Sequence, residues 1–478
     1  MSVIRNIAQD EWRQWRRSRL AMLSLILFSI LLVFTTLLTF VETQDARHQR
    51  LHQQEQAEQT FLDQPDRHPH RMVHYGHYVF RTPPPLAIFD PGVDAVTGQS
   101  MFLEGHRQNS AMFADARADA RTGGFGIVSL AKLYHLFLPL LILALGHAVI
   151  IRERETRTLG PLLSQGVSGT QLYSGKLLAL AALIILVSLP VLFSSVMAVI
   201  LGESFLSGFL VYAAHVIYLS LWATLALFVS VITRSRGFAL GILLVVWVAT
   251  VLVIPRIGVT SASALIPTEG KIISDMRMND DLRKLGDGHN ASDPAFTKLR
   301  ADILAKYGVD KVEDLPVNYR GVVASANEEK LTETLNEYAE KRFAREAAQA
   351  SHLSAYSWLS PYLAISGASR HFAGTDLATH HRFLREAEEL RYEFVQGLNK
   401  THIEQLSYEA DLNRNNGEEG RRRARIDSQN WQVLNDFRFK PASASERFGR
   451  AKMQLIALLL WLLVLLGVGV ASARRLTP

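Results

Sequence analysis

The sequence predicts a mainly α-helical membrane protein with six transmembrane helices, an amphipathic N-terminal interface helix and a largely helical outer domain made from two insertions. Three observations support this prediction. Apolar residues make up 48% of the 478-residue chain, and they gather in blocks of about 20, the length that a helix needs to cross a bilayer core. The short connections that carry arginine or lysine are all expected on one side of the membrane. Two long polar stretches, 42–132 and 255–452, interrupt the apolar blocks.

Residues 1–41 are expected to form the interface helix and the first span. Between residues 3 and 19, isoleucine, alanine and tryptophan recur at helical spacing with arginines between them, the pattern of a helix that lies at the membrane surface. The uncharged span Leu20–Val41 follows. A signal peptide is the alternative, but this apolar run is too long for one and no small-residue cleavage site follows it.

Five further spans are predicted from the remaining apolar blocks. They are Leu133–Ile151, Leu177–Leu201, Phe209–Ile232, Gly237–Ile254 and Met453–Ala471. Spans two to five thus occupy 133–254, and residues 453–478 supply the sixth span and a tail. Pro139 and Pro190 are expected to kink their helices.

The distribution of basic residues predicts the orientation of the spans. The N-terminus, the loop 152–176, the link 233–236 and the C-terminus all carry arginine or lysine, whereas the link 202–208 carries only a glutamate. The positive-inside rule then places both termini in the cytoplasm and both insertions, 42–132 and 255–452, outside. The net charge of +6 therefore fits membrane orientation, and no folded nucleic-acid motif is present.

The two insertions are expected to pack into one outer unit. Residues 45–61 look helical and continue the first span, and residues 74–80 alternate as in a strand. Apolar residues at helical spacing predict helices over 328–352 and 376–412, and these should supply most of the apolar core. The chain contains no cysteine, so packing alone must stabilise this unit.

The loop 152–176 contains the strongest candidate for a functional site. It opens with alternating charges, and from Leu159 to Leu172 it has the pattern of a short amphipathic helix and a turn. An exposed apolar ridge would gain from burial in a groove of a partner protein; the alternative is that it lies on lipid. The ridge consists of Leu159, Leu162, Leu163 and Val167.

The same loop ends in Gly175-Lys176, which is not a phosphate-binding loop. Thr170 stands where such a loop needs its first glycine, and Leu177 follows the lysine instead of serine or threonine. Lys176 is therefore expected to be a cationic anchor at the start of the third span, and the chain should not bind ATP by this route.

Two groups of histidines are further candidates. His135, His147 and His215 lie within spans, where ionisable residues mark a pathway or a polar contact; the alternative is a position at the membrane surface. His68, His70, His74 and His77 have a spacing that suits zinc or copper. The preferred interpretation of this second group is a histidine-rich surface, so no metal ligand and no catalytic residue is assigned.

The loop sequence resembles the coupling-helix signature of permease subunits of ATP-binding cassette (ABC) transporters, in the type-2 exporter family. The resemblance rests on the segment 152–164, on Val167-Ser168 and on Gly175-Lys176, and the segment 230–235 and Trp247 also look like that family's fourth and fifth spans. The two large insertions depart from common members. Segments such as 74–81 and 360–363 look like a bacterial subgroup with a periplasmic domain of this kind.

The resemblance implies a membrane permease subunit of an ATP-driven exporter in the bacterial inner membrane, with a periplasmic outer domain. Such a subunit is not itself an enzyme and has no cofactor, because ATP and magnesium bind to a separate partner. Two ABC ATPase subunits, a second permease copy or paralogue, the lipid membrane and periplasmic proteins are the implied partners. The implied coupling residues are Arg152, Glu153, Arg154, Glu155, Thr158, Leu159, Leu162, Leu163, Ser164 and Val167.

Two other classes of function remain open. One is a membrane-anchored scaffold whose outer domain recruits envelope proteins without transport. The other is a membrane metalloprotein that uses the outer histidines.

Overall fold

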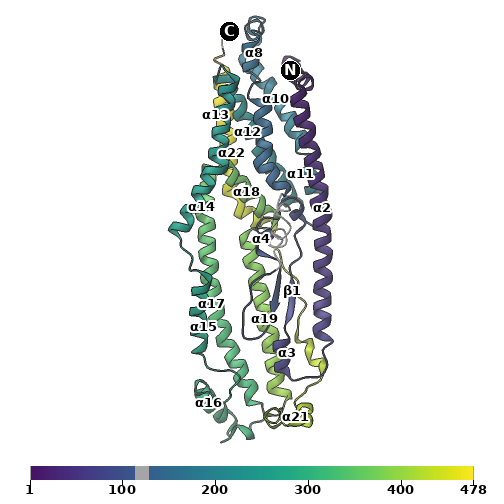
Figure 1. Ribbon diagram of the computed structural model, residues 1–478, viewed down its shortest axis with the longest axis vertical. Helices are drawn as coiled ribbons and strands as arrows, with labels where there is room; N and C mark the ends of the chain where they lie inside the picture. Colours follow the sequence, from purple (N-terminus) through teal and green to yellow (C-terminus); the bar gives the residue numbers. More distant parts are fainter. Residues whose placement is uncertain (1, 113–128, 477–478) are drawn as a thin grey trace.

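The computed structural model describes residues 2–112 and 129–476 and has an elongated, mainly helical architecture (Figure 1). Both ends of the chain lie at the same end of the long axis, together with the short helices α8 (Ile151–Glu155) and α9 (Leu159–Ser164). We call this the loop end. The mainly α-helical class predicted from the sequence is confirmed.

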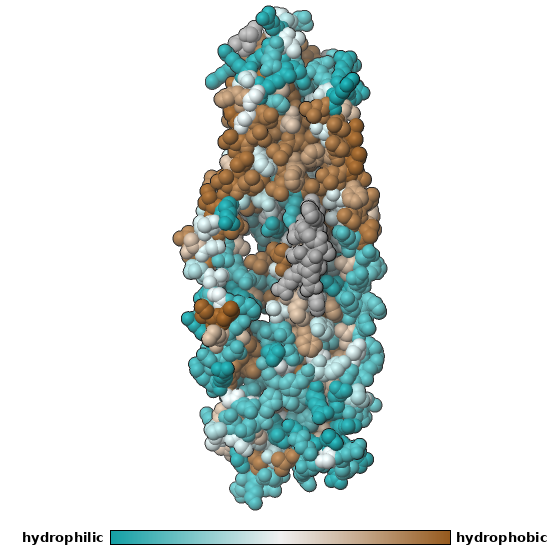
Figure 2. Space-filling model, viewed as in Figure 1, coloured by the Kyte–Doolittle hydropathy of each residue, from teal (hydrophilic) through white to brown (hydrophobic). Residues whose placement is uncertain are grey.

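Among the described residues, six helices or helical runs are long and apolar enough to cross a membrane, as predicted. On the face that Figure 2 shows, an apolar belt lies between a small polar cap at the loop end and a long polar region, which we call the polar body. The chain is therefore a multi-pass membrane protein. The six candidates are Arg19–Leu62, Leu130–Glu155, Gly169–Val187, Phe205–Ile232, Arg236–Leu265 and Ala444–Ala473.

The N-terminal helices α1 (Ser2–Arg17) and α2 (Arg19–Leu62) meet at Ser18. The Ser18 side chain accepts a hydrogen bond from the backbone N–H of Ala21 and caps α2. As expected, α2 continues beyond the apolar block, so that one unbroken helix of 44 residues runs from the belt along the polar body.

The second and third spans are interrupted where proline was expected to kink them. The second is divided into α6 (Leu130–Lys132), the π-turn η2 (Leu133–Phe137), α7 (Leu138–Gly146) and α8. The third is divided at Ser188 into α10 (Gly169–Val187) and α11 (Leu189–Ile200). Pro139 and Pro190 lie directly after these breaks. Each proline lacks the backbone N–H that would form the next intrahelical hydrogen bond, and this interrupts the helix.

Helix α10 begins at Gly169 rather than at the expected Leu177. Ser168 and Gln171 form a capping box, in which each side chain binds the other's backbone N–H, and this fixes the earlier start. The connection between the second and third spans is therefore shorter than the predicted loop 152–176.

Helix α12 (Phe205–Ile232) is the centre of the membrane part and packs against α7, α10, α11 and α22 (Ala444–Ala473). The fifth span is α13 (Arg236–Val248), η3 (Ala249–Val253) and α14 (Ile254–Leu265), which continues past the predicted end. Helix α18 (Pro361–Ala373), expected to be part of the outer insertion, packs against α12 and α22, and its Ile365 and Phe372 are fully buried there.

Apart from α18, described parts of both insertions pack together in the polar body, as predicted. Its main hydrophobic cluster joins Phe61 of α2 and Met101 of the strand β2 (Ser100–Leu103) to Phe394 of α19 (Leu377–Gln405). Strand β2 pairs antiparallel with β1 (His77–Phe80), with His77 opposite Leu103. The strand expected over 74–80 is thus shorter than predicted, because α3 (Pro69–Tyr75) occupies its start.

The two long helices of the second insertion are present as α17 (Tyr319–Ala355) and α19. They pack against each other, but only α19 lines the main cluster. Helix α17 instead supplies Tyr319 and Val323 to a smaller cluster with Phe296. The expectation that both helices provide most of the core is therefore right for α19 alone.

The remaining described elements are short. They are η1 (Pro85–Ile88), α4 (Asp94–Thr97), α15 (Lys271–Arg283), η4 (Pro294–Phe296), α16 (Thr297–Tyr307), η5 (Val312–Asp314), η6 (Tyr356–Trp358), α20 (Tyr408–Leu412), α21 (Gly417–Arg423) and η7 (Ser428–Val433).

Candidate functional site

The candidate coupling residues lie at the loop end on α8, α9 and the turns beside them. The expected short helix and turn are present as α9 and residues 165–168. Arg157 before α9 has φ 57° and Gly166 after it has φ 87°, the left-handed conformation in which a chain can reverse direction. Helix α9 therefore stands between two sharp turns at the end of the molecule.

A buried ionic network ties this end to α1 and α10. The Lys176 ammonium lies 2.7 Å from Glu11 Oε2 and 2.7 Å from Glu153 Oε1, and the side chains of Lys176 and Glu11 are 1% and 0% exposed. Arg152 also contacts Glu11 Oε2, at 2.5 Å. The expectation that Lys176 is a cationic anchor at the start of the third span is wrong, because α10 already begins at Gly169 and two carboxylates enclose the ammonium group inside the protein.

Thr158 joins the same network from the start of α9. Its hydroxyl donates to Glu153 Oε2 at 2.5 Å, so Glu153 is bound from both sides, by Thr158 and by Lys176. The start of α9 is therefore connected through Glu153 to Lys176 on α10.

The other charges of α8 also have partners within the chain. Arg154 donates to the carbonyl oxygens of Thr233 (2.5 Å) and Val231 (2.7 Å) at the C-terminal end of α12, where free carbonyls favour a cation. Glu155 forms an ion pair with Arg236 at the start of α13. The four charges from Arg152 to Glu155 thus connect α8 to α1, α10, α12 and α13. They are already paired within the chain, so they do not need a partner protein to neutralise them.

The predicted apolar ridge is only partly exposed. Leu159 is 3% exposed and belongs to the membrane-part core, and Leu163 and Val167 pack against that core while half-buried. Leu162 is half-buried as well, and Ser164 is exposed. The face of the loop end that is open to a partner is instead polar. We call it the tip surface, and it consists of Thr156, Arg157, Pro161, Ser164 and Gln165.

The N-terminal helix α1 packs along α10. Trp12 Nε1 donates to the carbonyl oxygen of Ala179 at 3.2 Å, and Trp15 is 3% exposed. Gly175 allows this close approach, because a Cβ there would lie 2.6 Å from side-chain atoms of Ile7. The arginines of α1 remain exposed, which agrees with the amphipathic pattern of the sequence.

Two of the three histidines in the spans contact each other. His135 Nε2 lies 3.0 Å from His215 Nε2, and both side chains are buried. Because His215 Nδ1 lies 2.7 Å from the Val211 carbonyl oxygen and donates to it, its Nε2 accepts in the neutral form and His135 donates. His147 Nδ1 lies 2.9 Å from the nearby carbonyl oxygen of Ala144. The expected polar contact is thus present for His135 and His215, and a pathway role stays a prediction.

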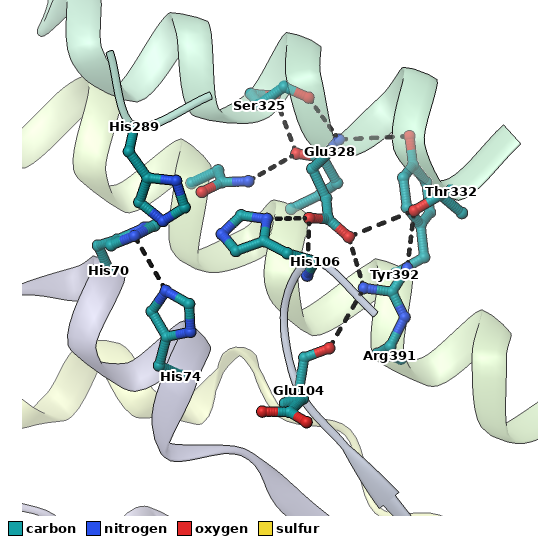
Figure 3. Close-up of polar contacts among 12 residues, drawn as sticks. His70, His74, Glu104, His106, His289, Ser325, Glu328, Thr332, Arg391 and Tyr392 are labelled. Carbon is teal, nitrogen blue, oxygen red and sulfur yellow. Dashed lines mark hydrogen bonds and ion pairs between the residues drawn. The ribbon is translucent and has the colours of Figure 1, made fainter. Parts of the chain in front are cut away.

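The outer histidines divide into three environments. His70 and His74 meet His106 and His289, shown in Figure 3. His68 binds Asp411, with 3.1 Å between Nε2 and Oδ1. His77 is buried beside Phe61. Burial, together with the neighbouring imidazoles, lowers the pKa of His70 to about 2, and burial lowers that of His77 to about 4, so both are neutral at pH 7.

Sequence reasoning missed Glu11, His106 and His289. Glu11 had a signal, since it shares the inner face of α1 with Ala8 and Trp15 at helical spacing, and a carboxylate on an apolar face needs a buried partner. His106 and His289 are isolated in the sequence. Only the tertiary fold brings them to α3.

Two protein families match separate parts of the chain. Residues 110–256 match the ABC-2 family transporter proteins, and residues 273–440 match a domain of unknown function, DUF3526. No curated protein matches the chain. The first match covers the second to fourth spans, most of the fifth, and α8 and α9 between them, so the resemblance found in the sequence is confirmed for this part. The bacterial subgroup remains a prediction.

Proposed function

We propose that this chain, an ABC-2 type permease subunit of an ABC transporter, acts as the membrane part of an ATP-driven exporter. It works with two separate ATPase subunits and with a second permease copy or a paralogue. ATP and magnesium bind to the ATPases, and the permease itself carries out no chemical step. The transported substrate crosses between the two permeases when the ATPases close.

The observation that carries this proposal is that the exposed tip surface lies directly beside the buried ionic network of Glu11, Glu153 and Lys176. A partner that presses on α9 moves Thr158, and Glu153 then transmits the displacement to Lys176 on α10 and, through Lys176 and Arg152, to Glu11 on α1. Such a chain of contacts suits a mechanical input from outside the membrane. The side chains of the predicted signature thus have two roles: Arg152 to Glu155 stiffen the loop end, and the tip surface meets the ATPase.

The proposed orientation is that both termini and the tip surface face the cytoplasm and the polar body faces the periplasm of a bacterial inner membrane. Exposed arginines gather at the loop end, among them Arg5, Arg13 and Arg16 on α1 and Arg474 after α22. Cytoplasmic ends of spans favour such residues. The polar body would then be free to select substrates or to bind periplasmic proteins.

The proposal is tested by changing the tip surface and measuring ATPase binding. The double variant Arg157→Glu/Pro161→Asp alters two exposed positions without touching the buried network. We expect at least about a tenfold loss of ATPase affinity, equal to about 1.4 kcal/mol, with unchanged membrane expression. The measurement is quantitative co-purification in detergent with a co-expressed ABC ATPase subunit.

The matched control is Arg421→Glu/Asn415→Asp, which makes the same charge changes at exposed positions of the polar body. It should bind the ATPase like the unchanged protein. Leu163 is unsuitable for this test, because it packs against the core and its loss would confuse docking with folding. If the tip variant binds the ATPase normally, the tip surface is not the docking site. If the unchanged protein binds no ATPase, a membrane-anchored scaffold explains the large polar body better.

A further inference from the structure

Four histidines from three separate segments meet in the polar body (Figure 3). His70 and His74 lie four residues apart on α3 and therefore on one face of that helix. His106 lies in the turn after β2, and His289 lies between α15 and η4. One ring nitrogen from each of the four lies within 4.8 Å of those of the others.

The four rings are arranged as a tetrahedron. The distances between ring centroids of the six pairs run from 4.7 Å, between His70 and His74, to 5.8 Å, between His74 and His289. Four imidazoles around a tetrahedral zinc ion, with Zn–N bonds of about 2.0–2.1 Å, have centroids about 5 Å apart. The side chains thus already have the spacing of such a site.

The ring nitrogens are also oriented for binding. His70 Nε2 and His74 Nε2 lie 3.2 Å apart. His106 Nδ1 lies 2.9 Å from Glu328 Oε2, although neither of its buried ring nitrogens makes a well-aligned hydrogen bond to the described residues. His289 turns Nδ1 to Asp287 Oδ1 at 3.2 Å. A carboxylate on the far nitrogen is the usual support of a metal-binding histidine, because it fixes the ring and raises its basicity.

The support behind His106 is rigid. Glu328 is fully buried and pairs with Arg391 at 2.5 Å, and Thr332 donates to the same carboxylate. The backbone N–H of His106 also donates to Glu328, at 3.3 Å. His106 has φ 65°, a backbone conformation that residues other than glycine rarely adopt. The fold therefore maintains an unfavourable backbone conformation that directs this ring into the cluster.

A neighbouring group, His68, His402 and Asp411, does not have these properties. Asp411 already accepts from His68, His402, Asn318 and Arg414, at distances from 2.7 to 3.2 Å. Both histidines use Nε2 for these bonds, and the arginine adds a positive charge. This group is a saturated hydrogen-bond centre of the fold.

We propose that His70, His74, His106 and His289 bind a divalent transition-metal ion of the zinc class in tetrahedral coordination through their Nε2 atoms. Neutral imidazoles prefer such ions to magnesium or calcium, which bind oxygen ligands. His74 and His289 are exposed, so that the ion can enter from solvent. The inference does not depend on ATPase docking, since the histidines lie in the polar body and not at the loop end.

Metal binding would join the α15 region to the rest of the polar body. The loop that carries His289 follows α15, which contacts α17 through a hydrogen bond of 2.6 Å from Tyr338 to Asp281. The other three ligands belong to the first insertion. One ion would thus link the two insertions directly.

The test is metal binding by the full chain in detergent or nanodiscs. After chelator treatment and reloading with cobalt(II) chloride, the unchanged protein should bind one cobalt ion per chain, by elemental analysis, and show the intense visible absorption of tetrahedral cobalt. Zinc chloride should displace the cobalt and remove the absorption, whereas magnesium chloride should not. The double variant His74→Ala/His106→Ala should lose both the bound ion and the absorption.

The control is His48→Ala/His52→Ala, which removes two exposed histidines of α2 outside the cluster and should bind like the unchanged protein. The variant Asp287→Asn removes the exposed carboxylate that contacts His289 Nδ1. It should keep the fold and weaken cobalt affinity about 10- to 100-fold. Absence of stoichiometric cobalt from the folded, unchanged protein overturns the proposal. Binding that persists in His74→Ala/His106→Ala also overturns it.

Discussion

Lys176 is the residue on which the buried network of the loop end depends. Its replacement by methionine leaves Glu11 and Glu153 without their shared cation, in a region where Glu11 is 0% exposed. Removal of one partner from a buried ion pair costs about 3–5 kcal/mol. We therefore expect Lys176→Met to lower the stability of the protein strongly, measured as the midpoint of thermal unfolding in detergent.

Lys306→Met provides the comparison, because Lys306 is exposed on α16 and its loss should change the midpoint little. The triple variant Lys176→Met/Glu11→Gln/Glu153→Gln removes the uncompensated charges and should recover part of the loss. If Lys176→Met alone is as stable as the unchanged protein, water or another cation neutralises Glu11 and Glu153, and the network does not depend on Lys176.

At this scale the sequence was informative about residue types and less so about partners. The resemblance of 152–164 to a coupling-helix signature points to Arg152 and Glu155, yet their partners Glu11 and Arg236 lie in distant segments. The histidine cluster shows the same limit. His70 and His74 could be paired by helical spacing, but the positions of His106 and His289 follow only from the packing of two insertions.

Among the elements, α10 and α22 meet closely at the loop end. A Cβ on Gly169 would lie 2.1 Å from the carbonyl oxygen of Ala473, so Gly169→Ala must displace one helix end. Overpacking of this kind costs about 1–3 kcal/mol. We expect a lower unfolding midpoint and weaker ATPase binding, since the start of α10 follows directly on the tip surface.

Gly237→Ala is the matched substitution, because an added Cβ on Gly237 of α13 meets no atom within 4 Å. A helical Gly→Ala change in open space should be neutral or stabilising by up to about 1 kcal/mol. Equal effects of the two variants would show that the contact between α10 and α22 is loose enough to adjust.

Element boundaries were predictable where hydropathy or a cap defines them. All six spans were found, and the capping sequence Ser168 to Gln171 explains why α10 starts before its apolar block. Helix α18 was not recognised as part of the membrane core, since Ser369 and Arg370 make it look polar. In the fold, the buried Ser369 donates to Asp90 at 2.5 Å, and Arg370 remains exposed.

For the whole molecule, the orientation in the membrane gives a direct prediction. The chain has no cysteine, so single cysteines report without background. Glu418→Cys on the polar body should react with a membrane-impermeant thiol reagent in intact spheroplasts, and Gln165→Cys at the tip surface should react only after lysis. Both positions are exposed, whereas Asn399, within the same insertion, is 2% exposed and would not report.

Labelling of Gln165→Cys in intact spheroplasts would reverse the orientation and place the polar body in the cytoplasm. The overall plan, with six spans and one outer unit from two insertions, was accessible from the sequence because hydropathy acts over whole segments. The division of the core between α17 and α19 was not, because both helices have similar apolar patterns and only packing decides which one faces the first insertion.

Helix α2 gives the molecule a lever. Its 44 residues at about 1.5 Å per residue make a rod of about 66 Å, and its upper end adjoins α1, which carries Glu11 of the buried network. A rotation of about 5° at that end would swing the other end through about 6 Å, by the same rise per residue. A small rotation of α2 caused at the tip surface would therefore displace the far end of this helix, beside α3 and its histidines, by about the rise of one helical turn.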